Sequence, residues 1–261
     1  MSESSLSLGY PDFAAAVGRF MGFGGTSGAW SSDETDIIDD IVQSGVRRFY
    51  FPAPTPEAPS GYRWSFVFID ATQALIAADY DYDAPDSFGG MVSPFTFATA
   101  DTGYFALTKV SEAQIRVWQQ SGGASTSGPP RYFAVRPRDS GGTTGQRHEF
   151  LFWPTPDGVY TLQYTHMALI SKISTGAPYP LGGMAHCETI LESCLAVAEE
   201  RHDGEKGIHA AAYVERLAAS IALDINTQGV DSFGIAGDGG EVRMFRHFAA
   251  NSITVDGVTP S

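Results

Sequence analysis

Two cysteines and two histidines near the end of the sequence carry side chains that can bind metal ions. Cys187 precedes Cys194, and His202 precedes His209. Structural zinc sites usually pair ligands about two to five residues apart, and both of these intervals are longer. The spacing places the four side chains on helix faces, as thiols and histidines within a fold, and we expect no metal there.

A run of four aspartates between Asp79 and Asp86 has the composition of a calcium-binding loop. Such a loop needs a glycine at about its sixth position and a glutamate at about its twelfth. Counted from Asp79, those positions hold Ala84 and Gly90. The acids alternate with tyrosines instead, which is typical of the exposed face of a strand.

Covalent catalysis and phosphate binding also lack their usual sequence patterns. The chain has no Gly-x-Ser-x-Gly elbow and no Gly-x-x-x-x-Gly-Lys loop. His186 adjoins Cys187, but adjacent residues on a helix do not face each other. We therefore predict no catalytic residue, no cofactor and no enzymatic activity.

The charge balance restricts the partners of the protein. Its 261 residues include 16 Lys and Arg against 30 Asp and Glu, so the formal net charge is −14. Tight DNA binding requires basic surface to neutralise phosphates, so we expect DNA not to bind specifically. There is no apolar run of about 18 residues and no signal peptide, which predicts a protein of the cytoplasm without membrane contact.

Helical periodicity marks the beginning of the chain. Apolar residues from Phe13 to Met21 share one face of a helix predicted over 10–21. Ser31 and Glu34 form a capping box that starts a second helix, in which Ile37, Ile38, Ile41, Val42, Val46 and Phe49 are the predicted apolar face.

The middle of the chain changes to alternating periodicity after the proline-rich stretch 51–59. Alternation at 64–69 predicts a strand, and further strands are expected over 71–83, 95–109 and 131–136, with a short helix after Ser111. Segments 149–153 and 159–166 are predicted to form a hairpin around Pro156-Asp157-Gly158.

Helical periodicity returns over 184–202 and 208–224, and the Gly-rich stretch 226–261 has no clear period. The predicted fold class is α+β. We expect residues 1–60 and 180–225 to form one helical domain, residues 61–179 a β-rich insertion, and residues 226–261 an extended C-terminal tail.

An ordered set of segments resembles the head–tail connector, or adaptor, proteins of tailed phages. The segments are Tyr10-Pro11-Asp12-Phe13, Ser44-Gly45-Val46-Arg47-Arg48-Phe49-Tyr50, Asp81-Tyr82-Asp83-Ala84-Pro85-Asp86-Ser87-Phe88, Glu188-Thr189-Ile190-Leu191-Glu192 and Gly207-Ile208-His209. The resemblance spans roughly residues 10–225. It implies a helical adaptor domain and a ring, usually of twelve copies, docked beneath the portal protein. It implies no catalytic residues.

On this reading the protein is a virion neck subunit, assembled in the host cytoplasm. Its partners are further copies of itself, the portal and the next neck or tail-terminator ring, and DNA passes through its lumen. The clustered acids Asp36, Asp39 and Asp40 are candidates for the lumen surface. In the tail, a compact apolar and basic cluster predicts portal-binding residues: Arg243, Phe245, Arg246 and Phe248.

An alternative remains open from the residues alone. Aromatic residues Trp153, Tyr160 and Tyr164 on the predicted hairpin are compatible with a carbohydrate-binding or hydrolase β-domain of a phage particle. A hydrolase would need a pair of catalytic acids, and no such pair has a recognisable setting in this sequence.

Overall fold

The second helix begins where its capping box predicts. In the computed structural model, α2 (Ser32–Tyr50) starts directly after Ser31, whose side-chain oxygen accepts a hydrogen bond from the Glu34 backbone N–H. The Glu34 carboxylate in turn accepts one from the Ser31 backbone N–H at 2.7 Å. Two otherwise unpaired donors of the first turn are thereby satisfied.

The structure describes residues 3–227, except 55–60, 100, 102, 123–125, 140, 141, 143 and 144. The other α-helices in this part are α1 (Tyr10–Phe20), α3 (Glu112–Gly122), α4 (Met184–Asp203) and α5 (Ile208–Thr227). The strands are β1 (Phe68–Leu75), β2 (Asp81–Asp83), β3 (Phe88–Met91), β4 (Thr96–Phe97), β5 (Thr108–Lys109), β6 (Tyr132–Arg138), β7 (Arg147–Trp153) and β8 (Tyr160–Ala168). The predicted α+β class is confirmed.

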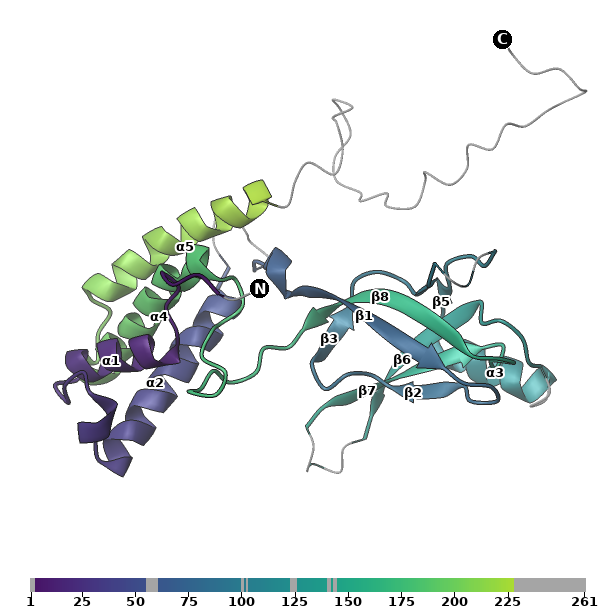
Figure 1. Ribbon diagram of the computed structural model, residues 1–261, viewed down its shortest axis with the longest axis horizontal. Coiled ribbons are helices and arrows are strands. Elements are labelled where there is room, and N and C mark those ends of the chain that lie inside the picture. Colours follow the sequence, from purple (N-terminus) through teal and green to yellow (C-terminus); the bar gives the residue numbers. More distant parts are fainter. Residues whose placement is uncertain are drawn as a thin grey trace, which may run out of the picture. The chain divides into compact units, whose positions relative to one another are not determined.

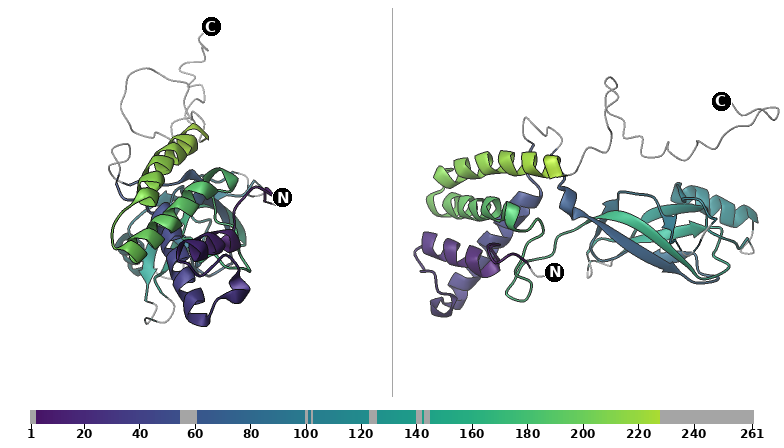
Figure 2. Two further views of the ribbon diagram at one scale, coloured as in Figure 1. Left: turned by 90° about the vertical axis from the view of Figure 1, so that its left-hand side faces the viewer. Right: turned by 45° about the horizontal axis from the view of Figure 1, so that its top comes forward.

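Helices from both ends of the sequence share one hydrophobic core. α4 contacts α1, α2 and α5, and α1 also contacts α2 (Figure 1, Figure 2). The buried side chains of this core include Phe13, Val17, Ile41, Phe49, Ile190, Cys194 and Leu217. On α2, Ile37 is the exception to the predicted apolar face, because 42% of its surface is exposed.

Helices α2 and α4 approach each other closely at Gly45 of α2. A Cβ atom placed there would lie 2.5 Å from the Cα of Cys194 on α4, so only glycine fits. The short distance allows two side chains of α4 to reach the α2 backbone. Ser193 donates from its hydroxyl to the Gly45 carbonyl at 2.8 Å, and the Cys194 thiol lies 3.6 Å from the Val42 carbonyl.

Two buried carboxylates fix the ends of α5. Near its N-terminus, Glu199 of α4 accepts hydrogen bonds from the backbone N–H groups of Gly207 at 3.0 Å and Ala210 at 3.2 Å. Near its C-terminus, Asp224 accepts one from the Tyr62 hydroxyl at 2.7 Å and one from the Ser65 backbone N–H at 2.9 Å. These bonds offset the cost of burying charge.

The alternating aromatics after the proline-rich stretch do not start a strand, contrary to the prediction. Ser65–Val67 is a short 3-10 helix, η2, and β1 begins only at Phe68. Trp64 is buried in the helical core, where its ring stacks on Phe49 at 4.5 Å and its indole N–H donates to the Phe49 carbonyl at 3.0 Å. Aromatic packing against helices, and not a pleat, explains this part of the pattern.

The strands form two four-stranded sheets. One has the order β1-β8-β3, with β4 also pairing with β8, and the other has the order β2-β7-β6-β5. The two sheets face each other as a sandwich, because a second hydrophobic core includes side chains from both. The buried side chains of this core include Leu75, Phe88, Phe133, Phe150, Phe152, Leu162 and Tyr164. α3 contacts β6 and β7, and its Ile115 is fully buried there.

The predicted hairpin between 149–153 and 159–166 is wrong. β7 pairs with β2 and β6, whereas β8 pairs with β1, β3 and β4 in the other sheet. The turn at Pro156-Asp157-Gly158 therefore carries the chain from one sheet to the other. A turn signal between two strands cannot distinguish this crossing from a hairpin, because both reverse the chain direction.

Gly45 provides a test of the helical contact. We expect Gly45→Ala to lower the free energy of unfolding by roughly 1–3 kcal/mol, the usual effect of overpacking, because the new Cβ meets backbone atoms that cannot rotate away. Urea denaturation followed by circular dichroism measures the change. Gly28→Ala is the matched control, since a Cβ there meets nothing within 4 Å. Equal stabilities of the two variants would contradict this account.

Candidate interaction sites

The three acids predicted for the lumen differ in their surroundings, although all lie on α2. Asp36 and Asp40 are exposed. Asp39 is partly buried and accepts hydrogen bonds from the Gln43 amide at 2.9 Å and the Lys172 ammonium at 3.0 Å. Burial raises the pKa of Asp39, but the bonds to Gln43 and Lys172 outweigh it, so the net shift is downward.

Asp39 therefore has a structural role that the sequence does not reveal. Gln43 also donates to the Ile173 carbonyl at 2.7 Å. Together Asp39 and Gln43 attach α2 to the segment that leads from β8 to α4. Lys172 lies far from Asp39 in the sequence, so no local pattern could have paired them.

The candidate zinc ligands do not converge. Cys187 and Cys194 are buried free thiols of α4, and burial raises the pKa of Cys194 to about 12. His202 is 2.8 Å from Asp203, and His209 is 2.9 Å from Glu192. Within the described ranges, no group of three or more His, Cys, Asp and Glu residues is placed to hold a metal ion.

The aromatic residues behind the carbohydrate-binding alternative do not form a shared surface. Trp153 is buried against β6, and Tyr164 is buried between the two sheets. Only Tyr160 is partly exposed, at the start of β8. The reason is the crossing between sheets, which places Trp153 and Tyr164 in different strand networks.

A different aromatic groove is present that the sequence pattern did not indicate. Phe105 is 90% exposed and lines it together with Tyr104, Phe97 and Arg131. The groove has a volume of about 430 Å³. The ring centroids of Phe97 and Tyr104 are 4.6 Å apart, and the ring of Tyr160 packs edge-on against both. Tyr104 is also exposed, at 45% of its surface, and a contiguous exposed aromatic patch can bind a partner.

The outward face of α5 is a second apolar surface. Large apolar side chains on it are exposed, at fractions between 41% and 82%: Ile208, Val214, Leu223 and Ile225. The opposite face packs on α4 through Tyr213 and Leu217. Exposed apolar side chains along one helix favour a protein–protein contact.

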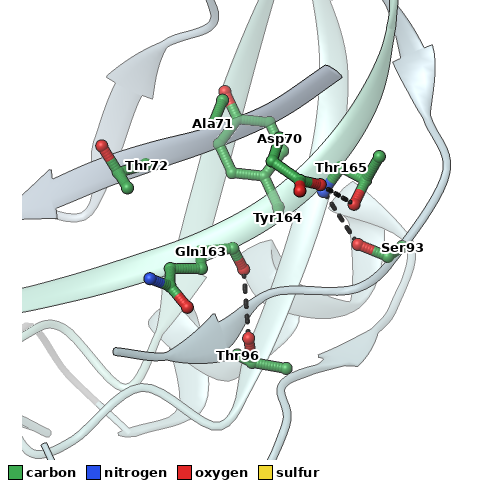
Figure 3. Close-up of a pocket in the computed structure, with 8 residues that line it drawn as sticks. All are labelled: Asp70, Ala71, Thr72, Ser93, Thr96, Gln163, Tyr164 and Thr165. Atoms are coloured by element: carbon green, nitrogen blue, oxygen red, sulfur yellow. Dashed lines mark hydrogen bonds between the residues drawn. The ribbon is translucent and has the colours of Figure 1, made fainter. Parts of the chain in front are cut away.

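A polar pocket of about 470 Å³ lies over β1, β8 and β4 (Figure 3). Thr165 donates from its hydroxyl to the Asp70 carboxylate at 2.7 Å, and its backbone N–H donates to the Ser93 hydroxyl at 2.8 Å. Thr72, Thr96 and Gln163 complete the polar lining. Such a pocket can bind polar or basic groups. It holds one carboxylate, so it does not provide the acid pair of a hydrolase.

The predicted portal-binding residues Arg243, Phe245, Arg246 and Phe248 lie outside the described residues, as does the rest of 228–261. None of the helices in the described part of the chain is both long and apolar enough to cross a membrane.

Comparison with known protein families gives a match over most of the chain. A family model described as SU10 adaptor protein matches residues 9–234 of the chain. No curated protein sequence matches significantly.

Asp39 provides a test of the contact between α2 and the segment after β8. We expect Asp39→Asn to lower the free energy of unfolding at pH 7 by about 1 kcal/mol, through loss of charged hydrogen bonds. The folded state lowers the pKa of this carboxyl. Its stabilisation is therefore present above the unfolded pKa of about 3.9 and is lost as the pH falls through the folded pKa.

Urea titrations of wild type and variant at pH 7 and near pH 3 measure this difference, which should shrink at the lower pH. Asp36→Asn is the matched control on the same helix, with an expected change within about 0.5 kcal/mol. A larger effect at Asp36 than at Asp39 would overturn the assignment.

Proposed function

Because this chain belongs to the SU10 adaptor protein family, a family of phage head–tail adaptors, we propose that it forms a structural ring in the virion neck. The ring joins the portal of the DNA-filled head to the tail and lets DNA pass through its lumen. The observation that carries the proposal is the extent of the match, which reaches from residue 9 to residue 234 and so includes every helix and strand of the described chain.

We further propose that the chain divides by role. Residues 1–60 and 180–225 are the helical adaptor domain, residues 61–179 are a β-rich insertion, and residues 226–261 are the C-terminal tail. The first two tail residues complete α5, and the remainder is proposed to be extended. In support, α1 and α2 share one core with α4 and α5, while the sheets have cores of their own. The role is structural and not enzymatic.

Contacts between copies would close the ring. A ring requires a heterologous contact, in which two different surfaces of each copy meet. The exposed apolar face of α5, with Val214 and Ile225, supports one of these two surfaces. The family resemblance implies twelve copies.

Asp36 and Asp40 are the lumen acids in this proposal. They are exposed on α2, whereas Asp39 is held by Lys172. Like charges repel in a narrow channel, so an acidic lumen would keep DNA from adhering. The net charge of −14 supports the same conclusion.

The tail is proposed to dock on the portal through Arg243, Phe245, Arg246 and Phe248. Two arginines can meet acidic groups of a partner while the aromatic rings fill its pockets. The opposite side of the ring would contact the next neck ring or the tail terminator. The protein would assemble in the host cytoplasm and reside in the virion, without membrane contact.

Carbohydrate binding remains the second candidate function, and one observation favours it. The groove at Tyr104 and Phe105 exposes an aromatic ring beside Arg131, a combination that can stack on and hydrogen-bond to a sugar.

Mass measurement separates the two functions. Light scattering of the full-length protein mixed with its portal should give a multimeric ring complex, because the adaptor role requires contacts between copies. Phe105→Ala should leave that complex intact, since the groove belongs to the other function. A protein that stays monomeric with portal and binds glycans through Phe105 would favour the second candidate.

Deletion of residues 228–261 tests portal docking. We expect the truncated protein to keep its unfolding midpoint, because the cut follows the last turn of α5, and to lose attachment to portal-bearing heads. Sedimentation of heads with bound protein measures attachment. Arg243→Glu with Arg246→Glu in the full-length chain should reproduce the loss. Normal attachment of the truncated protein would refute the docking role, and its unfolding would place the tail in the core.

A further inference from the structure

The outer edge of β1 differs from the other sheet edges in the described residues. β2, β4 and β5 have three, two and two residues, and β3 has four with an irregular register at Phe88 and Gly90. Short or irregular edges prevent unwanted strand pairing. β1 has eight residues in unbroken register with β8, from Phe68 to Leu75, and lies last in its sheet.

The sequence of β1 also lacks the residues that usually protect an edge. Proteins place lysine or proline on exposed edge strands to prevent association. β1 reads FIDATQAL, with no lysine, arginine or proline, and its one charged residue is Asp70. Asp70, Thr72 and Ala74 are exposed. This edge is therefore suited to pair with another strand.

The hydrogen bonds of β8 identify which groups of β1 are available. The Thr165 backbone N–H donates to Ser93, and its carbonyl accepts from the Val92 N–H at 2.9 Å, so both groups point away from β1. In antiparallel sheets such pairs alternate with hydrogen-bonded pairs. Asp70, which lies opposite Thr165, therefore directs its own N–H and carbonyl toward the open edge.

The same geometry recurs along the strand. The Thr161 carbonyl accepts from the Ala98 N–H at 2.8 Å, and the Thr161 N–H donates to Asp101. Ala74 lies opposite Thr161, so its N–H and carbonyl also face outward. The carbonyl accepts a hydrogen bond from the exposed Gln73 side-chain amide at 3.0 Å, which an added strand would displace. Thr72 lies between Asp70 and Ala74 and has the same orientation. The outer edge of β1 thus presents backbone N–H and carbonyl groups at every second residue.

Side chains beside this ladder indicate a basic partner. Asp70 and Thr72 line the polar pocket of Figure 3. A residue directly opposite Asp70 on an added strand would lie about 5 Å away, within reach of its carboxylate if it is lysine or arginine. A second copy of β1 would bring another Asp70 and no basic residue. The basic segment of this chain, at Arg243 and Arg246, is assigned to the portal above.

We propose that the β1 edge binds an extended basic strand from another protein of the virion. The added strand pairs with the outward N–H and carbonyl groups of Asp70, Thr72 and Ala74, and a lysine or arginine faces Asp70. This binding mode is β-strand addition, in which the backbone supplies affinity and alternate side chains supply specificity. The source of the strand in the virion rests on the proposed neck function.

Cross-linking in the intact particle identifies the strand. A photoreactive amino acid replaces Thr72, purified particles are irradiated, and the linked peptide is sequenced by mass spectrometry. The expected product is a peptide of another virion protein that contains lysine or arginine. A peptide from residues 228–261, a peptide from β1 of a second copy, or no linked peptide would overturn the proposal.

Edge variants test the effect on assembly. Thr72→Pro removes an outward N–H that does not bond to β8, so the chain should still fold. The yield of tail-complete particles should fall about tenfold or more, which corresponds to about 1.4 kcal/mol of lost affinity. Thr72→Val keeps the N–H and is the matched control, with no expected loss. Asp70→Lys keeps the backbone and should cause a loss like that of Thr72→Pro, so the proposal stays testable if the proline variant misfolds.

Failure of the neck function and failure of strand addition at β1 give different results. Absence of the protein from purified particles would refute the proposed neck function. Presence of both the proline and the lysine variants in particles with normal tails would leave that function standing and refute strand addition at β1.

Discussion

The close crossing of α2 and α4 at Gly45 is the contact on which the rest of the structure depends. α2 lies before the strands in the sequence and α4 lies after them. Their backbones meet where Gly45 lacks a side chain and Ser193 reaches its carbonyl. The chain between residues 51 and 183 must therefore leave α2 at its end and return to the beginning of α4. Contacts between segments so distant in sequence carry a large loop-closure entropy, which dense packing at the crossing offsets.

Polar contacts fix the two connections between the helices and the strands, one before β1 and one after β8. On the outgoing side, Asp224 of α5 holds Tyr62 and Ser65 just before β1. On the returning side, Asp39 and Gln43 of α2 hold Lys172 and Ile173 after β8. Each connection thus donates hydrogen bonds to a carboxylate on a helix, which determines one path for the chain more strongly than apolar packing alone.

Local signals predicted the helices well because their determinants are close in sequence. Ser31 and Glu34 fixed the start of α2, and Ser111 preceded α3. Pairing of strands is non-local, so Pro156-Asp157-Gly158 predicts a hairpin turn where the chain instead passes from one sheet to the other. Trp64 and Phe66 alternate like a strand, but their rings pack against Phe49 and Tyr50 of α2. Likewise the partner of Asp39 and the open edge of β1 depend on residues far along the chain, and no spacing reveals them.

The burial of Cys194 has a consequence for how the protein can be observed. Its thiol is fully buried at the α2–α4 crossing, and its pKa near 12 keeps it protonated at neutral pH. Only the thiolate reacts with alkylating reagents, so modification must wait until the helices separate. The rate at which Cys194 is alkylated under native conditions therefore measures how often this crossing opens transiently. In an assembled particle, a lower alkylation rate would show that neighbouring proteins slow that opening.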